Sequence, residues 1–531
     1  MSPCSPRPLR LQVGNGVVPS PDILYVRLVC SFLLILAANS SADRGEELLS
    51  LLQSEALKAH VIALQENRQL TPELVTYRTR SSYYREAVNN AAQYIAAQFR
   101  RSPRLEVMFE EFGGLRNVVA KLPPRPGSTS SRVLILCAHY DTKADRDLSW
   151  NPLTSPAPGA NDNGTGIATM LEIAHLLSQF EYDHELRFVA FDGEEIGLLG
   201  SRHHASHAAQ LGENIVAVIN VDMVGFNWQR DLVEAATDDR SVWIAEALNI
   251  ANAWYAIGLE IRRSRDNTFD SSDHKPFWDN DYRAVTLVES TTPWRDSQDY
   301  EANPFYHTSQ DTVDKINFRL VGKVAGLVLV TLDSLANRDF DGNPRTFNLS
   351  IDVPLSTDEN PLAVTGQFSF PFPVLILVDP GQVAATVDRA TRTYTADVSL
   401  IPGANVVRAT VVDALSARSI EQTVQFIPNF EWRSVLIFPN PSRQADVLTV
   451  FRAEANRPIE ALSVFIHAAD GTMIRELIGV ADRFDSHVWR VWWNHQTPLG
   501  LPVAAGVYVC RFEAQVDAQL FSSTRKLAII R

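Results

Sequence analysis

Cysteine is scarce in this chain. Four occur among 531 residues, and two of them, Cys4 and Cys30, lie in a segment that we expect to be removed. The other two, Cys137 and Cys510, are far apart and fall in what we interpret as different domains. This scarcity implies no disulfide framework. The fold must therefore rest on hydrophobic cores, and a chain of this length predicts several of them.

Clusters of basic residues are also missing. The chain carries 48 Lys and Arg against 62 Asp and Glu, which gives a net charge of −14. Nucleic-acid binding depends on Lys and Arg gathered to face phosphates. We therefore expect no nucleic-acid partner.

The apolar run near the start of the chain is too short to span a bilayer. Arg27 precedes about 11 apolar residues, 28–38, which are followed by small residues up to Ala42. This pattern predicts a secretory signal peptide cut after Ala42, and hence a secreted or cell-surface protein. Residues 1–25 are Pro-rich and longer than an ordinary n-region, which leaves open whether Val26 is the true initiator.

Residues 43–336 alternate between short apolar runs and segments with helical periodicity. The strand-like runs lie at 116–122, 132–142, 186–195, 214–225 and 282–290. The clearest helical segments lie at 166–180 and 240–254. Such alternation predicts an α/β domain with a mixed, largely parallel sheet flanked by helices.

The character of the chain changes after residue 346. Period-two runs and turns follow, as in "NVVRATVVDA" and "LSVFIHAADGTMI", which predicts two all-β sandwiches at 345–428 and 432–531. The join "LANRDFDGNPRT" is polar and contains Gly and Pro, which favours a solvated linker over a shared core.

Potential metal ligands follow the apolar runs of the α/β domain. Chemistry in such sheets collects at the carboxyl ends of the strands. The candidates are His139 and Asp141 in "CAHYDT", Asp162 in "PGANDNGTG", Glu194 and Glu195 in "FDGEE", Asp222 in "NVDMVG" and His307 in "FYHTSQDT". Imidazoles together with carboxylates, one of them shared, suit a pair of zinc ions that keep a position open for water.

These motifs, in this order, resemble the secreted dizinc aminopeptidases of the bacterial leucyl aminopeptidase and aminopeptidase S and Y type, in metallopeptidase clan MH. The resemblance extends over about residues 91–335 and includes "NNAAQYIAAQF" and "SSDHKPFW". It implies a zinc exopeptidase fold, two zinc ions and peptide N-termini as substrate.

The resemblance also implies a role for each candidate residue. His139 and Asp222 would hold one zinc ion, Glu195 and His307 the other, and Asp162 would bridge both. Asp141 would orient His139. Glu194 would be the general base of a metallo-aminopeptidase, because neighbouring residues past a strand end point in different directions.

Two other functions stay open. A glutaminyl-peptide cyclase, a zinc acyltransferase, shares the "HYD" and "DGEE" elements, but "NDNGTG" and "HTSQDT" are the peptidase versions. A non-catalytic ectodomain of the transferrin-receptor type would have lost its metals, whereas this chain retains all five ligands and the base.

Several further residues near these motifs have plainer interpretations. His203, His204 and His207 suggest a metal tract, yet a solvated helix face is favoured over a third metal site. Asp273 and His274 match the "SDH" loop of the family and receive no ligand role. Tyr306 is interpreted as a packed aromatic rather than an oxyanion donor. The tract 293–305 is longer than in the family, which puts substrate contacts from it in doubt.

The two β-regions have resemblances of their own. Residues 345–428 resemble bacterial Ig-like repeats, and residues 432–531 are similar to the Ig-like fold of flagellar hook-capping proteins. Modules of the latter kind serve as sorting signals in type IX secretion, which implies contact with secretion machinery or the cell surface. A passive spacer is an equally good interpretation.

Overall fold

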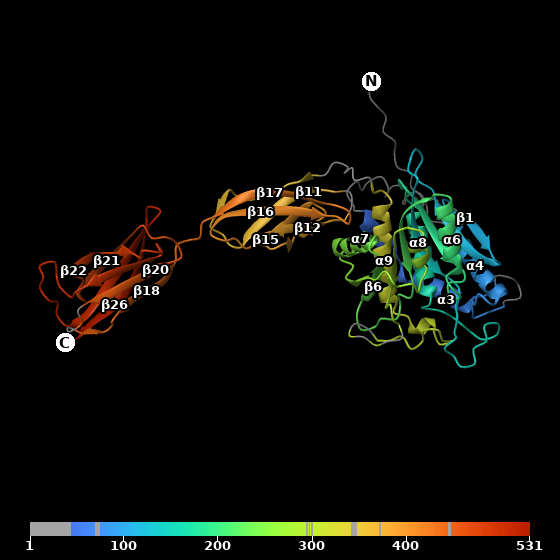
Figure 1. Ribbon diagram of the computed structural model, residues 1–531, viewed down its shortest axis with the longest axis horizontal. Coiled ribbons are helices and arrows are strands. Elements are labelled where there is room, and N and C mark those ends of the chain that lie inside the picture. The colour runs from blue at the N-terminus through green and yellow to red at the C-terminus, as the bar shows by residue number, and fades with distance from the viewer. Residues whose placement is uncertain are drawn as a thin grey trace, which may run out of the picture.

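The molecule is elongated, with an α/β body at one end and two all-β bodies in a row beyond it (Figure 1). The computed structural model describes residues 44–530 apart from 70–74, 294–295, 297, 299–300, 341–347, 371–372, 444–445 and 447. The predicted signal peptide therefore lies outside the described residues. Among those that are described, no helix combines the length and apolarity that a membrane crossing requires.

The α/β body is built on one eight-stranded sheet in the order β1-β2-β4-β3-β5-β8-β6-β7. Its strands are β1 (Glu106–Phe112), β2 (Leu115–Leu122), β3 (Arg132–His139), β4 (Glu185–Phe191), β5 (Asn214–Val221), β6 (Leu232–Thr237), β7 (Glu260–Arg265) and β8 (Ala284–Val288). Four of the seven neighbouring pairs are parallel, and the three at β1-β2, β2-β4 and β6-β8 are antiparallel. The predicted mixed sheet is confirmed.

Helices cover both faces of this sheet. They are α2 (Arg44–Leu51), α3 (Ser54–Glu66), α4 (Arg85–Phe99), α5 (Gly164–Leu177), α6 (Leu199–Gln210), α7 (Val242–Trp254), α8 (Lys275–Asp279) and α9 (Phe318–Leu335), with a 3-10 turn η1 (Val313–Lys315). Alternate residues of β3 divide the core: Leu134 and Leu136 pack with α4, α5 and α9, whereas Ile135 and Cys137 pack with α6 and α8. Burial on both faces explains why the central strands are continuously apolar.

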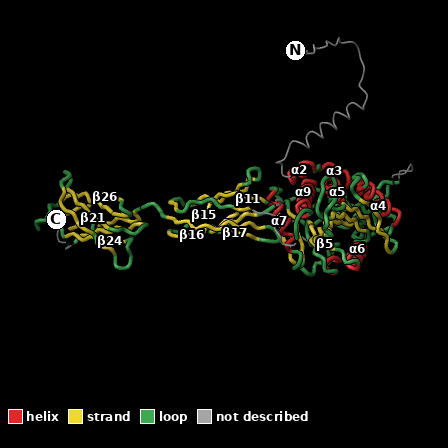
Figure 2. Tube along the Cα trace, turned by 90° about the horizontal axis from the view of Figure 1, so that it is seen from above, coloured by secondary structure: helices red, strands yellow, loops and turns green. Residues whose placement is uncertain are grey.

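The remainder of the described chain consists of strands and loops (Figure 2). The first all-β body stacks a sheet β10-β17-β16-β12-β13 on a sheet β14-β15-β11-β9. Its strands are β9 (Asn348–Leu349), β10 (Ser356–Thr357), β11 (Leu362–Ser369), β12 (Leu375–Asp379), β13 (Val383–Ala384), β14 (Thr386–Asp388), β15 (Thr393–Val398), β16 (Gly403–Val412) and β17 (Ala417–Phe426). Buried and exposed residues alternate along β11. The buried ones enter the core of this sandwich, which is a separate cluster from the core of the α/β body.

The second all-β body combines a sheet β18-β20-β24-β23 with a sheet β19-β26-β25-β21-β22. Its strands are β18 (Trp432–Phe438), β19 (Ser442–Arg443), β20 (Thr449–Ala455), β21 (Ala461–His467), β22 (Met473–Ile478), β23 (Val480–Ala481), β24 (Val488–Trp493), β25 (Gly506–Val516) and β26 (Gln519–Ile530). It has a third core, which includes Phe451, Trp493 and Phe512. Two all-β sandwiches were predicted, and their identity as Ig-like modules stays a prediction.

The α/β body and the first sandwich touch directly. Trp254, at the end of α7, packs edge-to-face on Phe368 with ring centroids 5.8 Å apart and joins the core of the sandwich. Arg338 pairs with Asp413 at 2.6 Å. Residues 341–347 of the join lie outside the described part, so the solvated linker stays a prediction. The two bodies touch through these contacts, although their buried residues form separate clusters.

Candidate functional site

The candidate ligands gather at the carboxyl ends of three adjacent parallel strands, β4, β3 and β5. His139 is the last residue of β3, Asp222 follows β5 directly, and the Glu194–Glu195 pair lies in the turn after β4. Asp162 lies just before α5, whose N-cap residue Asn163 accepts a hydrogen bond from the backbone of Gly166. The sheet order places these segments side by side, as expected for an α/β fold.

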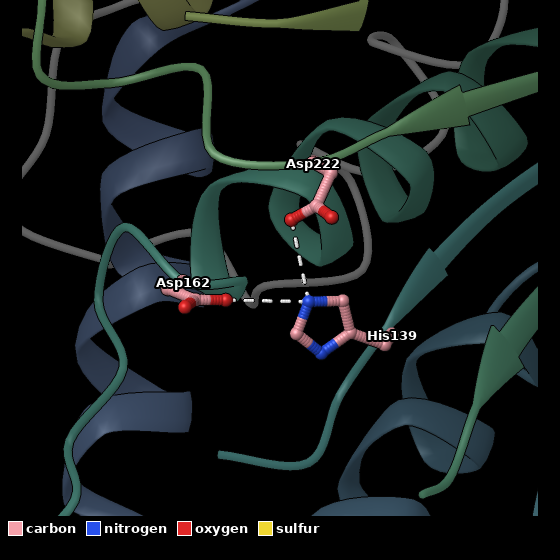
Figure 3. A group of neighbouring side chains, drawn as sticks. All are labelled: His139, Asp162 and Asp222. Atoms are coloured by element: carbon pink, nitrogen blue, oxygen red, sulfur yellow. Dashed lines mark hydrogen bonds and ion pairs between the residues drawn. The ribbon is translucent and has the colours of Figure 1, made fainter. Parts of the chain in front are cut away.

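The first group consists of His139, Asp162 and Asp222. His139 Nε2 lies 3.2 Å from Asp162 Oδ1 and 3.3 Å from Asp222 Oδ1 (Figure 3). All three residues are buried. Ser272 Oγ donates to the other oxygen of Asp222 at 2.6 Å, which fixes the orientation of that carboxylate.

The second group consists of Asp162, Glu195 and His307. His307 Nε2 lies 3.1 Å from Asp162 Oδ2 and 3.3 Å from Glu195 Oε2. The two oxygens of Asp162 therefore face different histidines, so this carboxylate belongs to both groups. All five ligand candidates predicted from the sequence are brought together, while the role of each stays a prediction.

The donor set fits zinc. His139 Nδ1 lies 3.2 Å from the backbone carbonyl of Asp141, which can only accept, so Nδ1 carries a proton and Nε2 is the ring nitrogen that a cation would bind. Ligand atoms held tetrahedrally at about 2.0–2.2 Å from one zinc ion lie about 3.4 Å apart, close to the separations in both groups. Glu195 Oε1 is buried and, among the described residues, has no hydrogen-bond partner. A cation would satisfy it.

The electrostatics of the site point the same way. Burial raises the pKa of Glu195, and the charge of Asp162 adds to the rise. Burial also raises the pKa of Glu194 well above its ordinary value, with His139 opposing and Glu195 reinforcing the shift. Burial alone would raise the pKa of Asp162, but the two histidines lower it. Carboxylates crowded out of water in this way favour a bound cation.

Asp141 does more than the sequence suggests. The Asp141 carboxylate lies 3.5 Å from His139 Nδ1, whereas the backbone carbonyl oxygen of Asp141 lies 3.2 Å from the same nitrogen. The same carboxylate accepts hydrogen bonds from the backbone N–H groups of Glu194 and Glu195 at 3.1 and 3.2 Å, and from Ser82 Oγ at 3.0 Å. Asp141 thus joins the segment after β3 to the glutamate turn after β4.

Other supporting residues were missed by the sequence analysis. Asp311 accepts from the backbone N–H of Asp162 at 3.0 Å and of Asn161 at 2.9 Å, and so holds the segment that carries the shared carboxylate. Burial raises the pKa of Asp311 to about 7. Arg80 is fully buried and donates to the carbonyls of Tyr140, Leu64, Pro158 and Gly159. Asp311 stands within the "HTSQDT" motif and could have been noticed, whereas Arg80 carries no sequence signal.

Two charged residues lie at the rim of the second group. Lys143 Nζ is 3.1 Å from Glu195 Oε2, and Asp145 Oδ1 is 3.5 Å from His307 Nδ1. Tyr306 stacks on the ring of His307 with the ring centroids 3.7 Å apart. The Cζ atom of Arg146 lies over the Tyr306 ring, 5.2 Å from its centroid. The packed-aromatic interpretation of Tyr306 agrees with these contacts.

Comparison with known proteins adds a family to this geometry. Residues 117–332, which include all five ligand candidates and Glu194, match the family described as "Peptidase family M28". The chain is similar to Aminopeptidase YwaD of Bacillus subtilis (strain 168), with 32% identity over 199 residues, 37% of this chain and 39% of that protein. It is also similar to a probable zinc metalloprotease of Pyrenophora tritici-repentis, with 26% identity over 238 residues, 39% of this chain and 54% of that protein.

The matches leave large parts uncovered on both sides. The chain spans well under two thirds of the length of these two curated relatives. Among solved structures, the LapA aminopeptidase of Legionella pneumophila has a TM-score of 0.46 at 19% identity, covering 56% of this chain and 77% of that one. The all-β bodies lie outside the family match.

Proposed function

We propose that this chain, whose residues 117–332 match peptidase family M28, is a secreted zinc-dependent aminopeptidase that releases N-terminal residues from peptides. One observation carries the proposal: the two oxygens of Asp162 face His139 at 3.2 Å and His307 at 3.1 Å, so that two donor groups share one carboxylate. A shared carboxylate between two imidazole-containing groups is the arrangement expected for two zinc ions.

In this proposal His139, Asp162 and Asp222 hold one ion, and Asp162, Glu195 and His307 hold the other. Zinc in such a site polarises a carbonyl group and lowers the pKa of a water molecule. The chain itself fixes the ligands: Ser272 orients Asp222, Asp311 holds the backbone of Asp162, and the carbonyl of Asp141 sets the tautomer of His139.

Glu194 is the general base. It belongs to neither donor group, yet its charge is close enough to those of His139, Glu195 and Asp222 to couple with them. Because burial raises its pKa, Glu194 is a stronger base than an ordinary carboxylate, which suits it to take a proton from the attacking water and give it to the departing amine. Asp141 sets the direction of this side chain by binding the backbone N–H of Glu194.

The preference for chain ends rests on the similarity to aminopeptidases such as YwaD. In this proposal Asp162, Glu195 and Asp222 are metal ligands, so two zinc ions would balance their negative charge. An aminopeptidase acts on a free N-terminus, so we expect an acetylated N-terminus not to be hydrolysed.

One assay tests the activity. The purified protein with zinc is offered an aminoacyl-nitroanilide, its N-acetylated form and a glutaminyl peptide. We expect hydrolysis of the first, loss of hydrolysis on acetylation, and no cyclised product from the third. Cyclisation of the glutaminyl peptide would support the cyclase instead of the aminopeptidase. Failure to bind zinc together with no turnover of any of the three would favour a non-catalytic ectodomain.

Export is part of the proposal and rests on the sequence of residues 26–42 alone. N-terminal sequencing of protein recovered from the culture medium of the native host should begin at Asp43. Retention of residues 1–42 in the mature protein would contradict it. The all-β bodies, as sorting or surface modules, would then change the amount exported when deleted, without changing the chemistry.

A further inference from the structure

Three histidines of α6 converge on one glutamate outside the active site. His203, His204 and His207 face Glu110 of β1, the edge strand of the sheet. The interpretation of this tract as a solvated helix face is only partly right, because His204 is buried. The side chains of His203 and His207 are 37% and 55% exposed and so remain accessible to solutes.

Glu110 is held in a fixed orientation. Asn117 Nδ2 donates to its Oε2 at 2.7 Å, and His204 Nδ1 donates to the same oxygen at 3.0 Å. Burial alone would raise the pKa of Glu110, but the hydrogen bonds from His204 and Asn117 lower it to about 2. The carboxylate is therefore ionised at neutral pH, and two donors orient it as a supporting shell orients a metal ligand.

The other oxygen of Glu110, Oε1, lies 3.2 Å from His204 Nδ1 and also faces the two exposed imidazoles. His203 Nε2 and His207 Nδ1 each lie 3.9 Å from Glu110 Oε1. That separation is too long for a hydrogen bond. Two atoms that bind the same zinc ion tetrahedrally at about 2.0–2.2 Å lie about 3.4 Å apart, so each imidazole has to move toward Oε1 before the three residues can hold one ion.

The helix presents the two histidines together. Residues four apart occupy the same face of a helix, which is the spacing at which two histidines chelate one metal ion. Phe112 stacks on His203 with centroids 4.6 Å apart and planes at 9°, which fixes that ring. The rings of His203 and His207 are stacked 6.0 Å apart, so closure on one ion requires the exposed His207 ring to turn.

We propose that His203, His207 and Glu110 form an additional site for zinc or a divalent transition metal ion of the same class, separate from the two active-site groups. The ion would join α6 to the edge strand β1. Because α6 begins four residues after Glu195, this link would stiffen the helix that follows the glutamate turn. The site does not depend on the proposed activity.

Zinc content tests the assignment. Untagged protein is dialysed against buffered micromolar free zinc, and bound zinc per chain is measured for the native protein and for His203→Gln, His207→Gln and Glu110→Gln. The matched control is His487→Gln, because the His487 side chain is also 37% exposed and pairs with a carboxylate, that of Asp485.

We expect each of the three variants to bind one zinc ion fewer than the native protein, and His487→Gln to bind the same number. The thermal unfolding temperature of the native protein should also rise on going from nanomolar to micromolar free zinc by more than that of His207→Gln. His207 is exposed, so its variant should fold normally. Equal zinc content in the native protein, His203→Gln and His207→Gln would overturn the site.

Discussion

Glu194 and Glu195 are neighbours in the sequence but have different surroundings. Glu195 contacts His307 Nε2 at 3.3 Å and Lys143 Nζ at 3.1 Å, whereas Glu194 belongs to neither donor group. The backbones of both are tied to the same carboxylate, that of Asp141. This fixed turn would let one glutamate act as the general base and the other as a metal ligand.

Substitution of the two glutamates should separate these purposes. Glu194→Gln should retain the bound zinc and lower kcat by about two to four orders of magnitude, because only proton transfer is lost. Glu195→Gln should instead weaken zinc binding at the group that contains His307. Zinc content and kcat measured on both variants decide the matter, and equal zinc loss in the two would refute the division of labour.

Glu110 gives a pH dependence of stability. Its pKa of about 2 in the folded chain is below the ordinary value of 4.5, so the stabilisation is present above about pH 4.5 and is lost as the pH falls toward 2. We expect the free energy of unfolding to fall over this window by on the order of 3 kcal/mol more in the native protein than in Glu110→Gln. Urea unfolding between pH 5 and pH 2.5 measures the difference, and parallel curves would contradict the shift.

At the scale of elements, the sequence predicted the central strands well and the outer ones poorly. β2, β3, β4, β5 and β8 are apolar because helices cover both faces, so they stand out as runs. β1, β6 and β7 were missed. β1 has three glutamates in "EVMFEEF" and β7 three arginines in "EIRRSR", and both are edge strands whose exposed residues hide the pattern. β6 is buried along its whole length, but "LVEAAT" is short and is interrupted by Glu234.

The metal-ligand candidates could be predicted from the sequence, whereas some of the residues that support them could not. His139, Asp222 and the two glutamates follow recognisable strands, so the sheet itself brings them together. Ser82 and Arg80 could not be predicted, because their contacts with Asp141 and Gly159 span 59 and 79 residues of sequence. No local pattern records a contact that only the folded chain creates.

The loop before Asp162 should be intolerant of a side chain at Gly159. This residue has φ +53, and an added Cβ would lie 2.2 Å from Thr142 Cγ2 and 2.3 Å from the backbone oxygen of Asp162. Gly159→Ala should therefore lower both the unfolding temperature and the affinity for zinc. The control is Gly113→Ala, with φ +52 and nothing within 4 Å, which should cost only about 1 kcal/mol of strain. Equal effects of the two substitutions would show that crowding is unimportant.

For the whole molecule, catalysis and the all-β bodies should be separable in activity but not in stability. All candidate site residues precede α9, so a fragment ending at Asn337 should hydrolyse small aminoacyl substrates with a kcat/KM close to that of the full chain. Its unfolding temperature should be lower, because Trp254 loses Phe368 and Glu46 loses its ion pair with Arg389. Activity assays and thermal unfolding measure the two effects.

A substitution in the full chain provides the control for that fragment. Trp254→Ala removes the aromatic contact while leaving every residue of the first sandwich in place, and should reproduce part of the loss in unfolding temperature with unchanged kcat/KM. A fragment that folds and binds zinc yet fails to hydrolyse small substrates would mean that the all-β bodies complete the active site.

The buried guanidinium of Arg80 sets how far the chain can be shortened from its beginning. It joins the carbonyl of Leu64 in α3 to those of Pro158 and Gly159, in the loop that leads to Asp162. A piece cut at the limits of the family match, 117–332, would lack Arg80 and leave the carbonyls of Tyr140, Pro158 and Gly159 without this donor. The smallest autonomous unit that can keep this chemistry therefore includes α3, although α3 contributes no ligand to the metal and lies more than fifty residues before the recognisable peptidase sequence begins.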